Sequence, residues 1–193
     1  MRNAIIVALA LVLMIAGTAF AEPQNKYVYE VGQLKPTDST LKVKEGEEAP
    51  DFTLPSINNG EVTLSDYRGK NNVVLSFVPA AFTPVCSDQW PGYNIMHEEF
   101  KKYDAVLLGI TVDNIPSLSA WTSQMGGVWF PVLSDFYAHG ATAIEYGILR
   151  GEGVSERALF VIDKQGVIRL IHVNDINRRP DAGIIFEALK KLK

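Results

Sequence analysis

Through its central part, the chain alternates between continuous apolar runs and segments whose apolar side chains recur at helical spacing. The runs at 73–78 and 105–112 are typical of strands that are buried on both faces of a sheet. Helical spacing predicts helices over residues 84–103 and 116–125, and a short strand is expected at 130–133. Such alternation of strands and helices is typical of an α/β fold.

The C-terminal part of the chain predicts a different connection. After a short helix expected at 138–146, two apolar runs at 158–163 and 167–173 flank a three-residue turn that ends in Gly166. Glycine accepts the positive φ that such a turn needs, so the two runs predict an antiparallel hairpin. A final amphipathic helix is expected at 181–192. The sequence therefore predicts a central mixed β-sheet flanked by helices on both faces.

Residues 1–21 are typical of a secretory signal peptide. A short positive start at Arg2 precedes an apolar run at 4–15, and residues 19–21 (Ala-Phe-Ala) offer a cleavage site between small side chains. The alternative is an uncleaved anchor, although the apolar stretch is at the short limit for crossing a bilayer. We expect cleavage and export to the periplasm or another extracytoplasmic compartment, with no membrane attachment afterwards.

Residues 22–48 are polar, are interrupted by proline and glycine, and show no clear period. They predict a mobile arm or linker with room for one short strand, and we refer to this segment as the arm. The globular domain is expected to span residues 49–193, a length that suits one domain with a sizeable core. The full chain carries a net charge of −4 without a basic block, which argues against a nucleic-acid surface.

Candidate chemistry centres on Cys86, the one cysteine of the chain, which follows Pro79-Ala-Ala-Phe-Thr-Pro-Val. Thr83 can cap a helix and Pro84 suits its first position, so Cys86 is expected in the first helical turn. Unpaired amide groups and the helix dipole favour a thiolate there, and we expect this sulfur to be accessible. The alternative is a buried, inert cysteine.

The spacing Pro79-x-x-x-Thr83-x-x-Cys86 resembles the active-site signature of the peroxiredoxins, which are thiol peroxidases on a thioredoxin-like fold. The resemblance spans residues 49–193 and includes the segments 49–52, 130–135 and 155–163. Residues near the cysteine are similar to a branch with hybrid peroxiredoxin–glutaredoxin relatives. The later half is closer to the alkyl hydroperoxide reductase type, here in a one-cysteine form.

The resemblance implies a role for each matching residue. Cys86 would attack a peroxide oxygen and become a sulfenic acid, while Thr83 would hydrogen-bond the thiolate and the incoming peroxide. Arg157 would stabilise the thiolate and polarise the oxygen–oxygen bond, and Pro79 would shield the pocket from water. The implied substrate site comprises Pro79, Thr83, Val85 and Arg157. For Arg157, the alternative is an ordinary surface arginine.

Two further residues leave alternatives open. Gln89 lies where many relatives carry an acid or an amide that helps to orient the site, but it could equally be a solvated helix residue. Trp121 could lie near the active site, in the core or at a dimer contact. The three histidines, at positions 97, 139 and 172, lack metal-ligand spacing, so they are interpreted as structural, and no metal or cofactor is expected.

The single cysteine also bears on recycling. A sulfenic acid returns to the thiol through a second thiol, which this chain does not supply. The expected reductant is therefore external, either a small thiol or a thioredoxin- or glutaredoxin-like protein. A homodimer or larger homo-oligomer is also expected.

Two other functions remain possible for such a fold. An exported thiol–disulfide oxidoreductase would carry a Cys-x-x-Cys pair, but Thr83 occupies the position of the first cysteine. A non-catalytic thioredoxin-like binding module is the second alternative, although metal capture normally needs two soft ligands close together.

Overall fold

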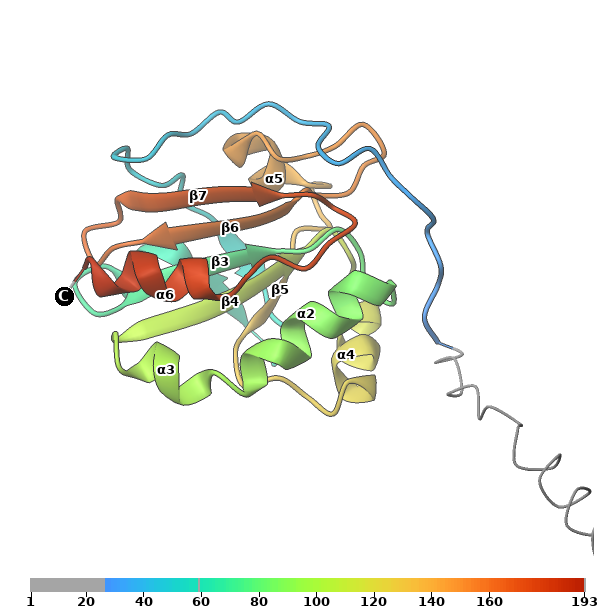
Figure 1. The fold of residues 1–193 in the computed structure, drawn as a ribbon, viewed down its shortest axis with the longest axis horizontal. Coiled ribbons are helices and arrows are strands. Elements are labelled where there is room, and N and C mark those ends of the chain that lie inside the picture. The colour runs from blue at the N-terminus through green and yellow to red at the C-terminus, as the bar shows by residue number, and fades with distance from the viewer. Residues whose placement is uncertain (1–26, 59, 193) are drawn as a thin grey trace, which may run out of the picture.

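The computed structural model describes residues 27–58 and 60–192, so the expected signal peptide lies outside the described residues. Within them, the centre of the fold is a five-stranded mixed sheet (Figure 1). The strands lie in the order β5 (Val132–Ser134), β4 (Ala105–Thr111), β3 (Asn72–Phe77), β6 (Arg157–Ile162) and β7 (Ile168–Asn174). β3 pairs in parallel with β4 and antiparallel with β6, which confirms the predicted mixed sheet.

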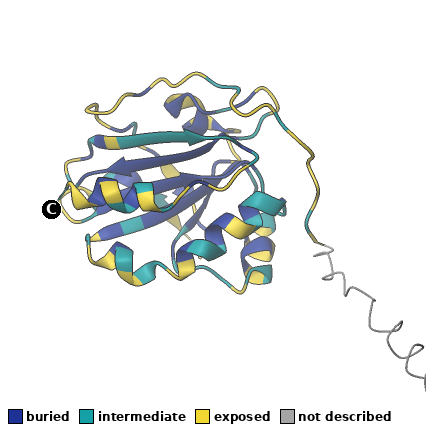
Figure 2. Ribbon diagram, viewed as in Figure 1, coloured by how far each residue is buried: buried dark blue, intermediate teal, exposed yellow. Residues whose placement is uncertain are grey.

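Burial on both faces explains why the inner strands have continuous apolar sequences. All six residues of β3 and of β6 are buried, and β4 has one partly exposed position. Figure 2 shows this buried centre, whereas the edge strand β7 is mostly half-buried. Each fully buried aliphatic or phenylalanine side chain contributes about 1.5–3 kcal/mol, so these strands hold the fold together.

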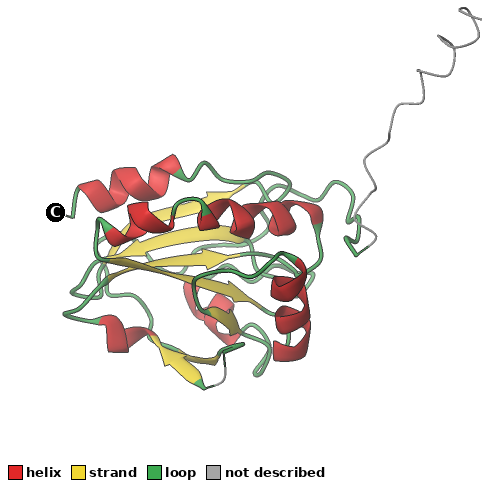
Figure 3. Cartoon of the chain, turned by 90° about the horizontal axis from the view of Figure 1, so that it is seen from below, coloured by secondary structure: helices red, strands yellow, loops and turns green. Residues whose placement is uncertain are grey.

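Helices cover the sheet on both sides, as predicted (Figure 3). One face packs against α2 (Pro84–Asn94), α3 (His97–Lys101), α4 (Ile115–Gln124) and α6 (Gly183–Lys190). The other face packs against α5 (Ala141–Tyr146), the 3-10 helix η1 (Leu64–Tyr67) and the two-stranded sheet of β1 (Thr53–Pro55) and β2 (Glu61–Thr63). The predicted hairpin is confirmed, because β6 and β7 are antiparallel and Gly166 has a φ of +84°.

The single helix expected over 84–103 is wrong, because the chain divides into α2 and α3. The carbonyl of Tyr93 accepts a hydrogen bond from the backbone amide of Met96 at 3.0 Å and another from the Trp129 indole at 3.1 Å. These contacts satisfy the helix end, and Ile95 at the break is exposed. Apolar side chains still point to the core on both sides of the break, which is why the spacing looked continuous.

The helix expected from residue 138 starts at Ala141 instead. The carboxylate of Asp135 accepts hydrogen bonds from the backbone amides of Thr142 and Ala143, at 3.0 and 2.9 Å. This side chain therefore fixes the first turn of α5 at a later point. Gly140 adopts a φ of +66° immediately before it, a conformation that glycine tolerates.

The described part of the arm, residues 27–48, lies on the domain surface and passes β7 and α5 (Figure 1). Hydrogen bonds join it to the domain; one runs from the amide of Lys42 to the carbonyl of Tyr146 at 3.2 Å. Its one β-type pairing with the domain is an isolated antiparallel bridge between Glu48 and Val167. Within the described residues, no helix is both long and apolar enough to span a membrane.

Candidate active site

Cys86 lies where the polypeptide passes from the sheet into α2. β3 ends at Phe77, and a short loop leads to Thr83, the residue that precedes the helix. Pro84 occupies the first helical position, so Cys86 is the third residue of the helix, as the sequence predicted. The amide of Ala81 donates to the Asp113 carboxylate at 2.8 Å, which fixes the loop over the end of β4.

Sheet topology brings Arg157 to the same place. Arg157 is the first residue of β6, and its neighbour Ala158 pairs with Phe77 at the end of the antiparallel β3. One terminal nitrogen of the guanidinium, Nη2, therefore lies 3.5 Å from the sulfur of Cys86. Only 2% of Arg157 is exposed, so the alternative of a surface arginine is wrong.

The acceptors around Arg157 are uncharged groups. Its Nη1 donates to the side-chain oxygen of Gln89 at 2.7 Å, and its Nε and Nη2 donate to the carbonyl of Ile176 at 3.1 and 3.0 Å. These bonds hold the guanidinium plane without cancelling its positive charge. A buried positive charge in this position can stabilise negative charge that develops beside it during a reaction.

Gln89 is buried, which rules out the solvated alternative. Its amide nitrogen donates to the Ser76 hydroxyl at 3.2 Å and to the Tyr93 hydroxyl at 3.1 Å. Burial raises the pKa of Tyr93, so this hydroxyl stays neutral. The two contacts orient the amide group so that its oxygen faces Arg157.

Thr83 occupies the predicted cap position, but its side chain does not cap the helix. The hydroxyl donates instead to the carbonyl of Ala80 at 2.9 Å, within the loop. The prediction of a side-chain cap is therefore wrong. The amides of the first turn are left to other partners, including any anion at this site.

The residues predicted to bind substrate line one pocket of about 400 Å³: Pro79, Thr83, Val85 and Arg157. Cys86 lies behind this lining and has 0% exposure. The expectation of an accessible sulfur is thus not met in this conformation. The thiol lies beside the pocket, but a peroxide can contact it only when the lining shifts.

Sequence reasoning missed one residue that holds the Arg157 guanidinium in place. The carbonyl of Ile176, which accepts two hydrogen bonds from Arg157, belongs to a polar loop after β7 without a recognisable motif.

Trp121 is a core residue: it is fully buried, its indole donates to the Ser87 hydroxyl at 3.0 Å, and its ring lies 4.9 Å from that of Trp90.

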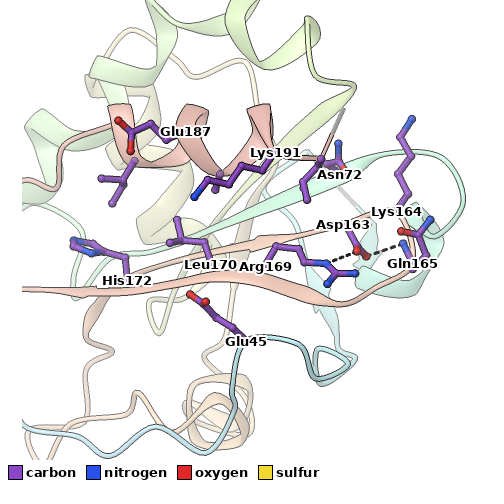
Figure 4. A pocket seen from close by; sticks show the side chains of 13 residues that line it. Glu45, Asn72, Asp163, Lys164, Gln165, Arg169, Leu170, His172, Glu187 and Lys191 are labelled. Atoms are coloured by element: carbon purple, nitrogen blue, oxygen red, sulfur yellow. Dashed lines mark hydrogen bonds and ion pairs between the residues drawn. The ribbon is translucent and has the colours of Figure 1, made fainter.

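A second, larger pocket of about 650 Å³ lies between β7 and α6 (Figure 4). Charged side chains surround it, including Asp163, Arg169 and Glu187, and it shares no lining residue with the pocket at Arg157. His172 lines it and contacts Asn174. Among the described residues, no group of three or more histidine, cysteine or acidic side chains is placed to hold a metal ion.

Comparison with known proteins decides between the alternatives. The sequence pattern of the AhpC/TSA family matches residues 46–171. The chain belongs to the AhpC/TSA family. It is therefore a peroxiredoxin, an enzyme of the thiol peroxidase class, and the shared fold is thioredoxin-like.

Individual relatives agree with this assignment. Alkyl hydroperoxide reductase E of Mycobacterium tuberculosis is 38% identical over 148 residues, which cover 76% of this chain and 96% of that protein. Peroxiredoxin-2 of Mus musculus is 37% identical over 155 residues, 75% of each chain. The reduced 2-Cys peroxiredoxin of Plasmodium vivax superposes with a TM-score of 0.71 at 29% identity, covering 76% of this peroxiredoxin and 80% of that structure.

Proposed function

We propose that this peroxiredoxin reduces hydrogen peroxide or organic hydroperoxides through Cys86. The thiolate attacks the terminal peroxide oxygen, the oxygen–oxygen bond breaks, and its electron pair leaves with the alkoxide or hydroxide. Cys86 becomes a sulfenic acid, and the leaving oxygen takes up a proton to give an alcohol or water. The observation that carries this proposal is the Arg157 guanidinium 3.5 Å from the sulfur, held by uncharged acceptors.

The surrounding residues suit the charge changes of this reaction. Negative charge moves from the sulfur to the leaving oxygen, and a fixed guanidinium beside the sulfur stabilises both ends of that path. Gln89 acts through Arg157 as a positioning residue. Thr83 presents a hydroxyl at the same pocket, and the buried ring of Pro79 limits the access of water.

Reaction requires a local movement, because the sulfur has no exposed surface. The first turn of α2 carries Cys86 and ends the loop from β3, so a shift there would open the sulfur to the pocket. Hydrogen bonds in a resting enzyme often tighten only when substrate arrives. The same movement would let a thiol reach the sulfenic acid.

Recycling is proposed to use an external thiol, because the chain has one cysteine. A small thiol or a thioredoxin- or glutaredoxin-like protein would condense with the sulfenic acid, releasing water and forming a mixed disulfide. A second thiol would then release Cys86 and leave as a disulfide. We further propose export after loss of residues 1–21, and assembly into a homodimer or larger homo-oligomer.

Mass spectrometry of the intact protein tests the central proposal. Addition of one equivalent of hydrogen peroxide should rapidly add one oxygen atom, and a sulfenic-acid reagent should label Cys86. Cys86→Ser should show neither change and no turnover. Thiol loss no faster than that of free cysteine would refute the peroxidase proposal. The same spectrum of the exported protein reports whether residues 1–21 are absent.

A further inference from the structure

Part of the pocket at Arg157 is built by the arm rather than by the domain. Residues 30–34 line it together with Pro79 and Thr83 of the loop before α2. This segment lies outside residues 46–171, the region that matches the family pattern. The family match therefore does not cover this part of the pocket lining.

The arm is fastened at both ends of this segment. Before it, the backbone amide of Tyr29 donates to the carbonyl of Phe82 at 2.7 Å. At its end, the amide of Leu34 donates to the side-chain oxygen of Asn177, whose amide nitrogen donates back to the Leu34 carbonyl, both at 2.8 Å. The segment is thus held between the loop before α2 and the loop after β7.

The pocket is much larger than hydrogen peroxide requires. A water molecule occupies about 30 Å³ of liquid volume, whereas this pocket measures about 400 Å³. Its lining is largely apolar and includes Val31, Leu34, Val85, Val154 and Ile176. The charged residues of the lining are Arg157, Glu30 and Glu152. The pocket therefore suits a molecule with a polar part that Arg157 can bind and an apolar part.

We propose that arm residues 30–34 determine substrate selectivity. The apolar part of an organic hydroperoxide contacts Val31 and Leu34, while its peroxide group is directed toward Arg157 and Cys86. The arm thereby favours apolar hydroperoxides over hydrogen peroxide, which is too small to use these contacts. This inference rests on the proposed peroxidase function and adds the selectivity element to it.

The test compares Leu34→Ala with Leu41→Ala. Both variants remove the same side-chain atoms from the arm, but Leu41 does not line the pocket. Rate constants for oxidation of Cys86 are measured with cumene hydroperoxide and with hydrogen peroxide in the full-length protein. We define the selectivity ratio as the rate constant with cumene hydroperoxide divided by that with hydrogen peroxide. In Leu34→Ala, this ratio should fall on the order of tenfold, because apolar contacts contribute to selection on this scale.

The control Leu41→Ala should keep the wild-type ratio, and Val31→Ala should lower it as Leu34→Ala does. Wild-type ratios in both pocket variants would overturn the inference while leaving the peroxidase function intact. An equal fall in Leu41→Ala would also overturn it, because selectivity would then not depend on the pocket lining. If neither peroxide oxidises Cys86 in the wild type, the proposed function itself fails.

Discussion

Two buried arginines, Arg150 and Arg157, lie seven residues apart and use their charges in opposite ways. Arg150 donates to the carboxylates of Glu156, at 2.8 Å, and Glu152, at 3.2 Å. Arg157 donates to an amide oxygen, a backbone carbonyl and the sulfur of Cys86. Carboxylates therefore compensate the positive charge of Arg150, whereas the positive charge of Arg157 faces the sulfur of Cys86 without a carboxylate partner among its hydrogen bonds.

The paired arginine acts on structure. Burial acts to lower the pKa of Arg150, but its hydrogen bonds to Glu156 and Glu152 outweigh this effect and raise it. The same pair holds the arm, because Arg150 donates to the carbonyl of Lys35 at 3.0 Å and Glu156 accepts from the amide of Asp38 at 2.6 Å. Of the two guanidinium groups, the one beside the reacting sulfur is the one whose acceptors are uncharged.

The largest expected effect comes from Arg157→Met. This change removes the charge beside Cys86 while keeping an unbranched side chain of similar length. The rate constant for oxidation of Cys86 should fall by about 100-fold or more, the scale on which removal of one preorganised donor acts. Residual thiol after rapid mixing with hydrogen peroxide measures it.

The matched control is Arg178→Met, at a side chain that is 82% exposed. In this variant, the rate constant for oxidation of Cys86 should equal that of the wild type. A loss of less than tenfold in Arg157→Met would remove this guanidinium from the reaction.

Arg150→Met should act on stability instead. It leaves the fully buried carboxylate of Glu156 without its cation, which costs about 3–5 kcal/mol in the free energy of unfolding. Urea unfolding measures this loss.

The double variant Arg150→Met/Glu156→Gln should recover part of the lost stability, since no unpaired charge remains. If Arg150→Met instead slows oxidation of Cys86 as much as Arg157→Met, with unchanged stability, the two arginines do not differ as described.

Gln89→Glu sharpens the comparison by giving Arg157 a charged partner like that of Arg150. The hydroxyls of Ser76 and Tyr93 can donate to the new carboxylate, so the fold should tolerate the change. Oxidation of Cys86 should slow on the order of tenfold, less than in Arg157→Met, because the guanidinium remains in place. The rapid-mixing assay measures it.

Gln165→Glu is the matched control, because it adds the same charge at an exposed turn at the other end of β6. It should react like the wild type. Equal rates in the two variants would show that the acceptors around Arg157 need not be neutral.

The sheet was predictable because its inner strands are buried on both faces. That environment requires the uninterrupted apolar runs at β3, β4 and β6, which the sequence displays directly. The break between α2 and α3 was not predictable, since it depends on the Trp129 indole reaching the carbonyl of Tyr93 from 36 residues away. Local periodicity carries no information about such a contact.

The candidate site also has parts that the sequence predicts and parts that it does not. Cys86 and Arg157 were identified through a motif and its resemblance, and the topology of β3 and β6 brings them together. The arm was read only as polar and irregular. Its place in the pocket depends on Asn177, a side chain 143 residues from Leu34, and no spacing rule connects the two.

The smallest expected effect concerns Asp175, in the loop that serves both Arg157 and the arm. Hydrogen bonds from the backbone amide and the side chain of Asn177 lower the pKa of Asp175, and the charges of Arg178 and then of Arg157 add to this. A lowered pKa in the folded state means that this carboxylate stabilises the loop above the ordinary aspartate pKa of about 3.9. The contribution is lost as the pH falls through the lowered value.

Acidification from pH 5 to pH 3 should therefore loosen the contact between Asn177 and Leu34. Hydrogen exchange, corrected for its intrinsic pH dependence, should show protection of residues 30–38 falling a few-fold, while β3 stays protected. Asp175→Asn removes this carboxylate, so the pH step in its arm should be smaller than in the wild type; the remainder comes from other acids such as Asp38, whose pKa is lowered chiefly by its hydrogen bond with Lys35. Equal protection of the wild-type arm at both pH values would mean that Asp175 does not hold the loop shared by Arg157 and the arm.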